Sequence, residues 1–164
     1  KKIIRINKKD LANVAKLIGS DVVLGLKSSC CLLTSKNKIK YFNKYQKTHI
    51  LVVKPVFGCS TKDIYSKVKK FNKPKLKQPK KMMLDLNYLK TMGNSLEAIV
   101  FSKYPKLKNI KLYLENLRDT EFVRMTGSGS ALIAYFRSKK RCEIAKKEFV
   151  KKYKNYWCIA SKTI

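Results

Sequence analysis

The 164-residue sequence is short of the residues that most catalytic and metal sites use. It has one histidine, His49, and five cysteines, none of them in a C-x-x-C pair. We therefore expect neither a metal site nor a Ser-His-Asp or Cys-His catalytic group. No apolar run reaches the roughly 20 residues of a membrane span, and the first residues do not resemble a signal peptide. Reduced thiols in a cytoplasmic protein without a membrane partner are expected.

Acidic residues are also scarce, because 10 Asp and Glu stand against 39 Lys and Arg, a formal charge of +29. Such a charge suggests a nucleic-acid partner. However, 34 of the basic residues are Lys and only 5 are Arg, whereas base readout favours Arg. The lysines are spread along the whole chain, as in proteins from AT-rich genomes. A nucleic-acid-binding module, using the aromatic and basic segment 38–47, is therefore kept only as the alternative.

Apolar periodicity predicts an α+β fold. Asp10 is expected to cap a helix that ends at Gly19, and Glu97 stands at capping-box spacing after Asn94. Segment 20–35 is apolar and β-prone. The predicted helices are 10–19, 60–71, 94–104, 105–117 and 138–153, and the predicted strands are 38–42, 49–54, 122–126, 131–136 and 156–161. Pro105 suits the first turn of its helix. Apolar spacing predicts that Ile64, Tyr65, Val68 and Phe71 share the inner face of the helix at 60–71, and that Cys142, Ala145 and Phe149 point inward from the helix at 138–153. The order helix, strand, strand, helix, strand at the end of the chain is part of a ferredoxin-like arrangement, although the last strand could instead return to a first lobe.

A serine- and glycine-rich segment, TGSGS at 126–130, lies between the two strands at 122–126 and 131–136. Its spacing fits neither G-x-S-x-G, nor a Walker A loop, nor G-x-G-x-x-G. Two interpretations stay open. The segment is a tight hairpin whose glycines supply positive φ, or it is a nest of backbone N–H groups and hydroxyls that holds phosphate oxygens.

Two further features suggest chemistry. Asp21 follows a predicted helix end inside an apolar run, where a carboxylate is costly unless it is paired or functional. It either bonds local backbone N–H groups or orients and deprotonates a hydroxyl. The segment KPVFGCSTKDIY runs from a predicted strand to Ser60 and Thr61 at a helix start, and helix starts favour anions.

In order along the chain, IGSD, VVKPVFGCSTKDIY, GNSLE and RMTGSGSALIAYF resemble the carboxyl-terminal part of the 4-diphosphocytidyl-2-C-methyl-D-erythritol kinase family, in the GHMP kinase superfamily. The resemblance implies a GHMP kinase-like fold: a ferredoxin-like carboxyl-terminal domain at 34–164, and at 1–33 the remnant of a ribosomal protein S5 domain 2-like amino-terminal lobe. It also implies transfer of the γ-phosphoryl group of ATP, with Mg²⁺ as counter-ion, to the 2-hydroxyl of the small-molecule substrate in the non-mevalonate isoprenoid pathway.

The same resemblance assigns roles to residues. Asp21 matches the catalytic aspartate, and Asn94 matches the N-x-L-E motif. The third superfamily motif, beside the phosphates, is matched by the loop Gly127, Ser128, Gly129 and Ser130. The substrate-binding position is matched by Thr61 and Ser60. The family's main ATP loop would precede Asp10 and does not occur in this sequence. We therefore expect a truncated kinase that is inactive alone. Segments 22–25 and 33–40 depart from the family pattern, and another GHMP substrate stays an alternative.

Overall fold

The computed structural model describes residues 6–19, 22–27, 29–34, 38–42, 47–70 and 80–163. Contacts between residues divide the chain into two compact units. The first unit comprises residues 1–45, 75–81 and 164, and the second comprises 46–74 and 82–163. The lobe boundary that we expect after residue 33 stays a prediction.

The first unit contains one helix, one 3₁₀ turn and one hairpin among its described residues. Helix α1 is Lys8–Ile18, the 3₁₀ turn η1 is Val22–Leu26, and strands β1 (Cys31–Leu33) and β2 (Ile39–Tyr41) pair antiparallel. The prediction that segment 20–35 is β-prone is therefore correct only for Cys31–Leu33, because Val22–Leu26 closes into a helical turn.

The start of α1 differs from the prediction. Asn7, not Asp10, is the cap: the Asp10 backbone N–H donates to Asn7 Oδ1 at 2.9 Å, and Asp10 lies inside the first turn. Asp10 still favours the helix there, because a carboxylate near the N-terminus interacts well with the helix dipole. Gly19 ends the helix as predicted.

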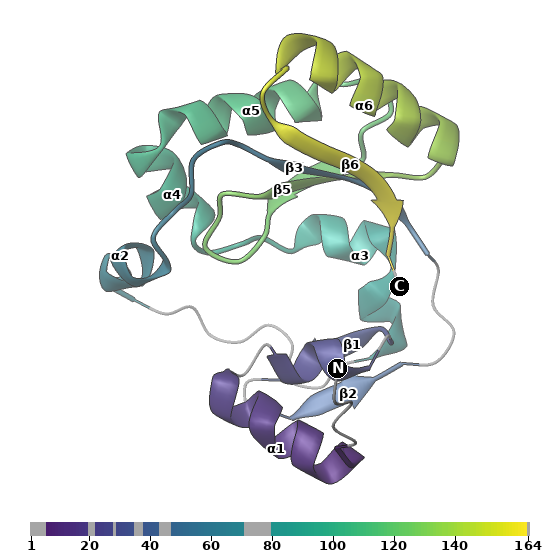
Figure 1. Cartoon of the computed structure of the whole chain (residues 1–164). Helices are drawn as coiled ribbons and strands as arrows, with labels where there is room; N and C mark the ends of the chain where they lie inside the picture. Colours follow the sequence, from purple (N-terminus) through teal and green to yellow (C-terminus); the bar gives the residue numbers. More distant parts are fainter. Residues whose placement is uncertain are drawn as a thin grey trace, which may run out of the picture. The chain divides into compact units, whose positions relative to one another are not determined.

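The second unit is built on a four-stranded antiparallel sheet (Figure 1). Its strands are β3 (His49–Lys54), β4 (Phe122–Met125), β5 (Leu132–Phe136) and β6 (Trp157–Lys162), in the order β4-β5-β3-β6. This is the ferredoxin-like order, with the first strand of the unit in a central position. The last strand does not return to the first unit; β6 pairs with β3 from Lys54↔Trp157 to His49↔Lys162.

The helices of the second unit are α2 (Thr61–Ser66), the 3₁₀ turn η2 (Lys81–Leu84), α3 (Leu86–Thr91), α4 (Glu97–Lys103), α5 (Pro105–Glu115) and α6 (Lys139–Lys152). Pro105 stands in the first turn of α5, as predicted, where its missing N–H costs nothing. Ser138 caps α6 by accepting the Arg141 backbone N–H. In the part of the chain that the structure describes, no helix is both long and apolar enough to cross a membrane.

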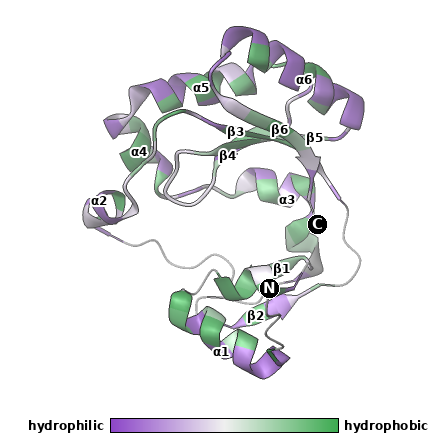
Figure 2. Ribbon diagram, viewed as in Figure 1, coloured by the Kyte–Doolittle hydropathy of each residue, from purple (hydrophilic) through white to green (hydrophobic). Residues whose placement is uncertain are grey.

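Helices α5 and α6 cover one face of the sheet, and α3 lies on the opposite side (Figure 1). Apolar colouring on α5 and α6 alternates with polar colouring along each helix (Figure 2). The predicted inward residues of α6, Cys142, Ala145 and Phe149, are buried, and Phe149 is fully inaccessible. A large apolar side chain buried in this way contributes about 1.5–3 kcal/mol, so this layer provides the platform for the loops at the strand ends.

The cysteines of this layer are free thiols. Burial raises the pKa of Cys142 to about 11, and burial likewise raises the pKa of Cys158 to about 11. The thiolate is the reactive form, so we expect iodoacetamide at pH 8 to alkylate both thiols about 100-fold more slowly in the folded chain than in the urea-unfolded chain. Peptide mass spectrometry after timed quenching measures both rates on the same residues.

The same shifts make stability depend on pH. The unfolded thiols ionise near their ordinary pKa of 9.0, while the folded thiols keep their protons up to about 11. The contribution is therefore fully present below about pH 9 and is lost as the pH rises toward 11. Equal alkylation rates in the two states, or a free energy of unfolding that rises across this interval, would contradict the assignment.

Candidate functional site

The glycine-rich segment is the loop of the β4–β5 hairpin. The Thr126 N–H donates to the Ala131 carbonyl at 3.0 Å, and the Gly129 N–H donates to the Thr126 carbonyl at 3.0 Å. Gly127 has φ of 55° and Gly129 has φ of 86°. The hairpin interpretation is therefore correct, and both glycines occupy conformations that other residues adopt only at a cost.

The inner side of the loop packs against the segment that follows β3. A Cβ placed on Gly129 would lie 3.1 Å from Met125 Sδ and 3.2 Å from Cys59 Sγ. The Ser130 side chain is buried, and its hydroxyl donates to the Phe57 carbonyl at 2.6 Å. Ser130 is therefore an anchor of the loop, and Ser128 is the loop hydroxyl nearer the surface.

Two predicted site residues meet above this anchor. The Thr61 and Ser128 hydroxyl oxygens lie 2.8 Å apart, although the residues are 67 positions apart in the sequence. Ser60 caps α2 by accepting the Asp63 backbone N–H at 3.3 Å. The structure thus assigns Ser60 to the local helix start and joins Thr61 directly to the glycine loop.

An ion pair links α2 to α4 beside this contact. Lys103 Nζ donates to Asp63 Oδ2. This hydrogen bond lowers the pKa of Asp63 and raises the pKa of Lys103. Because both side chains are about one third exposed, the pair holds α2 in place rather than contributing much stability.

The predicted capping box between Asn94 and Glu97 does not form. The residue before α4 is Leu96, which has no side-chain cap, and Asn94 Oδ1 instead accepts the Leu96 N–H at 2.9 Å. Glu97 turns toward the sheet, where its Oε1 accepts the Met125 N–H at 2.7 Å and its Oε2 accepts from Lys111 Nζ at 2.9 Å. A buried edge-strand donor offers a stronger partner than a solvated helix end.

Asn94 completes the arrangement from the other side. Its Nδ2 donates to the Met125 carbonyl at 2.9 Å and to the Gly127 carbonyl at 2.7 Å. Together Asn94 and Glu97 satisfy both backbone groups of Met125 at the free edge of β4. The N-x-L-E segment is therefore a clamp on the start of the glycine loop, and we call these two residues the loop clamp.

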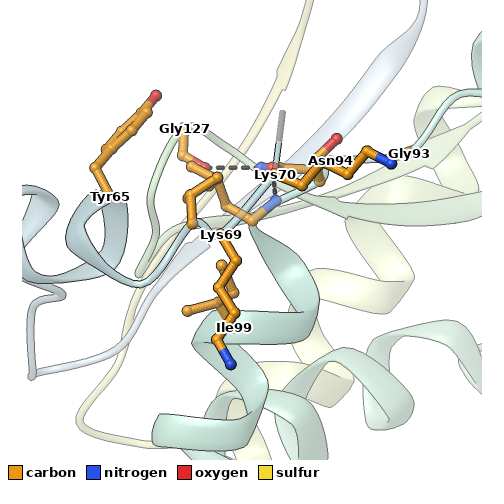
Figure 3. Close-up of a pocket in the computed structure, with 10 residues that line it drawn as sticks. Tyr65, Lys69, Lys70, Gly93, Asn94, Ile99 and Gly127 are labelled. Atoms are coloured by element: carbon orange, nitrogen blue, oxygen red, sulfur yellow. Dashed lines mark hydrogen bonds between the residues drawn. The ribbon is translucent and has the colours of Figure 1, made fainter. Parts of the chain in front are cut away.

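A cavity of about 500 Å³ opens next to the clamp. Figure 3 shows its walls: the segment after α2, the turn before α4, α4 itself, and Gly127. Tyr65, half exposed, faces the cavity together with Lys69 and Lys70. The tyrosine was predicted to pack inward on α2, but this six-residue helix buries only Ile64. Two cationic side chains beside a phenol and backbone amides are suited to a polar, anionic ligand.

The catalytic candidate Asp21 lies outside the described residues, and so does Phe71, which we expected on the inner face of α2. Glu97 and the lysines of the cavity were not predicted as site residues. The signal for Glu97 was its carboxylate one helical turn from Asn94, which we interpreted as a local cap. Among the described residues, no group of three or more His, Cys, Asp or Glu side chains could hold a metal ion.

A solved structure has the same fold. The structure resembles a solved one described as "Crystal structure of 4-(cytidine 5′-diphospho)-2C-methyl-D-erythritol kinase", with a TM-score of 0.70 and 22% sequence identity, over 92% of this chain and 56% of that chain. At that identity the likeness establishes the fold alone: the α+β fold of a GHMP kinase, with the ferredoxin-like sheet of its carboxyl-terminal lobe. No protein-family model matches the chain.

Several curated proteins are similar to the chain in sequence. The chain is 52% identical over 164 residues to the 4-diphosphocytidyl-2-C-methyl-D-erythritol kinase of Pelagibacter ubique, covering 100% of this chain and 58% of that relative. It is 33% identical over 146 residues to a putative kinase of the same name from Streptococcus mutans, covering 85% and 51%. The Clostridium tetani kinase is 30% identical over 166 residues, covering 97% and 58%.

These matches confirm the resemblance drawn from the sequence. The chain is homologous to the 4-diphosphocytidyl-2-C-methyl-D-erythritol kinases and corresponds to the carboxyl-terminal portion of such a kinase. It spans between half and three fifths of the length of these three relatives.

Proposed function

We propose that this chain supplies the carboxyl-terminal part of a cytoplasmic kinase that phosphorylates the 2-hydroxyl of 4-diphosphocytidyl-2-C-methyl-D-erythritol with ATP, its Mg²⁺ included, in the non-mevalonate isoprenoid pathway. The 52% identity to a relative of that name supports the substrate. The observation that carries the proposal is the contact between Thr61 and Ser128, at 2.8 Å, because it joins the predicted substrate-binding segment to the predicted phosphate loop.

Phosphoryl transfer needs positioning and electrostatic stabilisation more than covalent help from the protein. In the proposed step, the Asp21 carboxylate takes the proton of the substrate 2-hydroxyl as that oxygen bonds to the γ-phosphorus. The bond from the γ-phosphorus to the β,γ-bridging oxygen breaks, and ADP leaves. The glycine loop fits the phosphates because Gly127 leaves the backbone at the tip of the loop uncovered by a side chain. Lys69 and Lys70 add positive charge at the neighbouring cavity.

The test uses the protein extended upstream to the length of its relatives. We expect ATP-dependent phosphorylation of 4-diphosphocytidyl-2-C-methyl-D-erythritol, and we expect Asp21→Asn to lower kcat by about 10²–10⁴-fold, since the general base is lost. Asp10→Asn is the matched control: it removes a carboxylate from the surface of α1, and turnover should stay unchanged. Coupled detection of ADP gives kcat and KM for each variant.

A folded, extended protein without turnover on this substrate would overturn the substrate assignment. Turnover on the substrate of another GHMP kinase would then identify a different branch of the superfamily. Binding of single-stranded DNA or RNA with a steep dependence on salt, in the absence of any turnover, would favour the nucleic-acid alternative.

A further inference from the structure

The tip of the glycine loop is a tight turn with a defined peptide orientation. The hydrogen bond from the Gly129 N–H to the Thr126 carbonyl closes a four-residue turn over 126–129. Gly127, at the second position, has φ of 55°, whereas Ser128, at the third, does not have a positive φ. These signs are those of a type II′ turn. Rotation of its central peptide, between Gly127 and Ser128, would give a type I′ turn, which requires positive φ at Ser128 as well.

Asn94 holds this central peptide in one orientation. Both of its bonds to the loop are made by Nδ2, which donates to the Met125 and Gly127 carbonyls at 2.9 and 2.7 Å. Its Oδ1 accepts the Leu96 N–H at 2.9 Å. The two carbonyls need the NH₂ end of the side-chain amide and the Leu96 N–H needs its oxygen, so the amide group of Asn94 fits in only one orientation. The amide therefore matches its surroundings only while the Gly127 carbonyl faces Asn94 Nδ2.

This restraint determines where the next N–H faces. In a trans peptide the carbonyl and the N–H point in opposite directions. With the Gly127 carbonyl directed at Asn94, the Ser128 N–H is directed away from Asn94. No hydrogen-bond partner within the described residues accepts from this N–H. The Ser128 N–H is thus an oriented backbone donor without a partner among the described residues, next to the Ser128 hydroxyl.

We propose that Asn94 is a positioning residue that locks the Gly127–Ser128 peptide and so presents the Ser128 N–H to a phosphate oxygen of the nucleotide or of the substrate. The binding of a phosphate oxygen rests on the proposed function, whereas the fixed orientation of the Gly127–Ser128 peptide does not. Glycine at 127 adopts both turn types without strain, whereas the positive φ that a type I′ turn requires at Ser128 has a cost for a residue with a side chain. Asn94 adds to this preference for the type II′ turn from outside the loop.

Nuclear magnetic resonance of the 164-residue chain tests the lock without a ligand. In the wild type we expect a strong nuclear Overhauser effect between Gly127 Hα and the Ser128 amide proton, typical of a type II′ turn. Asn94→Asp keeps an oxygen for the Leu96 N–H but replaces both donors with a carboxylate that repels the two carbonyls. We expect a strong effect between the Gly127 and Ser128 amide protons to grow in, and exchange of the Gly129 amide to accelerate roughly 10–30-fold.

Asn116→Asp is the matched control. Asn116 also donates its side-chain amide to a carbonyl, that of Leu112 at 3.0 Å, but it does so at the exposed end of α5. This variant should keep the wild-type pattern at Gly127 and Ser128. Asn94→Ala, which introduces no charge, should behave like Asn94→Asp. If both Asn94 variants give the same spectra as Asn116→Asp at Gly127 and Ser128, Asn94 does not hold the peptide in one orientation.

Titration of the protein extended upstream to the length of its relatives, with Mg·ATP and, separately, with inorganic pyrophosphate, tests whether the Ser128 N–H meets a phosphate oxygen. We expect the Ser128 amide resonance of the wild type to shift on titration, and this response to weaken at least about tenfold in both Asn94 variants but not in Asn116→Asp. A wild type that shows the turn but no response at Ser128 would overturn presentation of this N–H to phosphate. Because the turn is read without ligand and turnover is read on the extended protein, failure of the lock and failure of the kinase proposal are separate results.

Discussion

Replacing Gly129 with alanine is expected to lower the free energy of unfolding of the second unit by about 2–4 kcal/mol. Two costs combine at this position. The backbone has φ of 86°, and the new Cβ would lie 3.1 Å from Met125 Sδ and 3.2 Å from Cys59 Sγ. The methionine chain can move aside, but Cys59 is held by the segment that carries the loop's anchor. Urea unfolding followed by tryptophan fluorescence measures the loss.

Two other glycines separate these costs. Gly127 also has positive φ, 55°, but nothing lies within 4 Å of an added Cβ, so alanine there should cost only about 1 kcal/mol. Gly93 has neither a positive φ nor a near neighbour, and its alanine variant should be close to neutral. If Gly129→Ala destabilises no more than Gly127→Ala, close packing beneath the loop is not what fixes this residue as glycine.

Replacing Glu97 with alanine, as a separate variant, should lower the free energy of unfolding by about 2–4 kcal/mol. The side chains of Glu97 and Lys111 are only 12% and 17% exposed, and their ion pair is 2.9 Å long. Alanine removes the acceptor of the Met125 N–H and leaves the Lys111 ammonium without this partner. Glu97→Gln retains an oxygen for the Met125 N–H, so it should lose less. Denaturant midpoints for the two variants provide the comparison.

Glu115 offers the matched control for the charge. It pairs with the same Lys111 Nζ at 3.5 Å, but its side chain is 37% exposed. Glu115→Ala should therefore change the free energy of unfolding by less than about 1 kcal/mol. Similar losses for Glu97→Ala and Glu115→Ala would show that the bond to Met125 contributes little, and that the ammonium is served equally by either carboxylate.

The ferredoxin-like sheet and the hairpin at 126–130 could be predicted because they follow from short-range pattern. Apolar alternation gives the strands, Ser138 marks the start of α6, and two glycines between strands mark a turn. The position of Thr61 near Ser128 could not be predicted from either segment, since it depends on β3 and β5 being neighbours in the sheet. The resemblance to the kinase family matched Thr61 to the substrate position and Ser128 to the phosphate loop, but it did not predict a contact between them.

The errors at Asp10 and Glu97 have one cause. Each residue fits the sequence pattern of a helix cap. That pattern takes no account of other hydrogen-bond partners, which compete with the cap in the folded chain. Asn7 stands in the better position for the N–H of Asp10, and Glu97 finds the Met125 N–H and Lys111 at a distance in sequence that no local rule covers. Tyr65 fails differently: apolar spacing assigned it to the inner face of a longer helix than the one that forms.

The central position of β3 also affects how the sheet forms during translation, because the strands are synthesised in chain order. Both partners of β3 come later in the chain, β5 at Leu132–Phe136 and β6 at Trp157–Lys162. Translation at about 5–20 residues per second leaves the apolar segment HILVV waiting roughly 4–16 s before its first partner is made. During this interval the nascent chain exposes a hydrophobic strand with two unpaired edges, which makes it a candidate for capture by chaperones during synthesis.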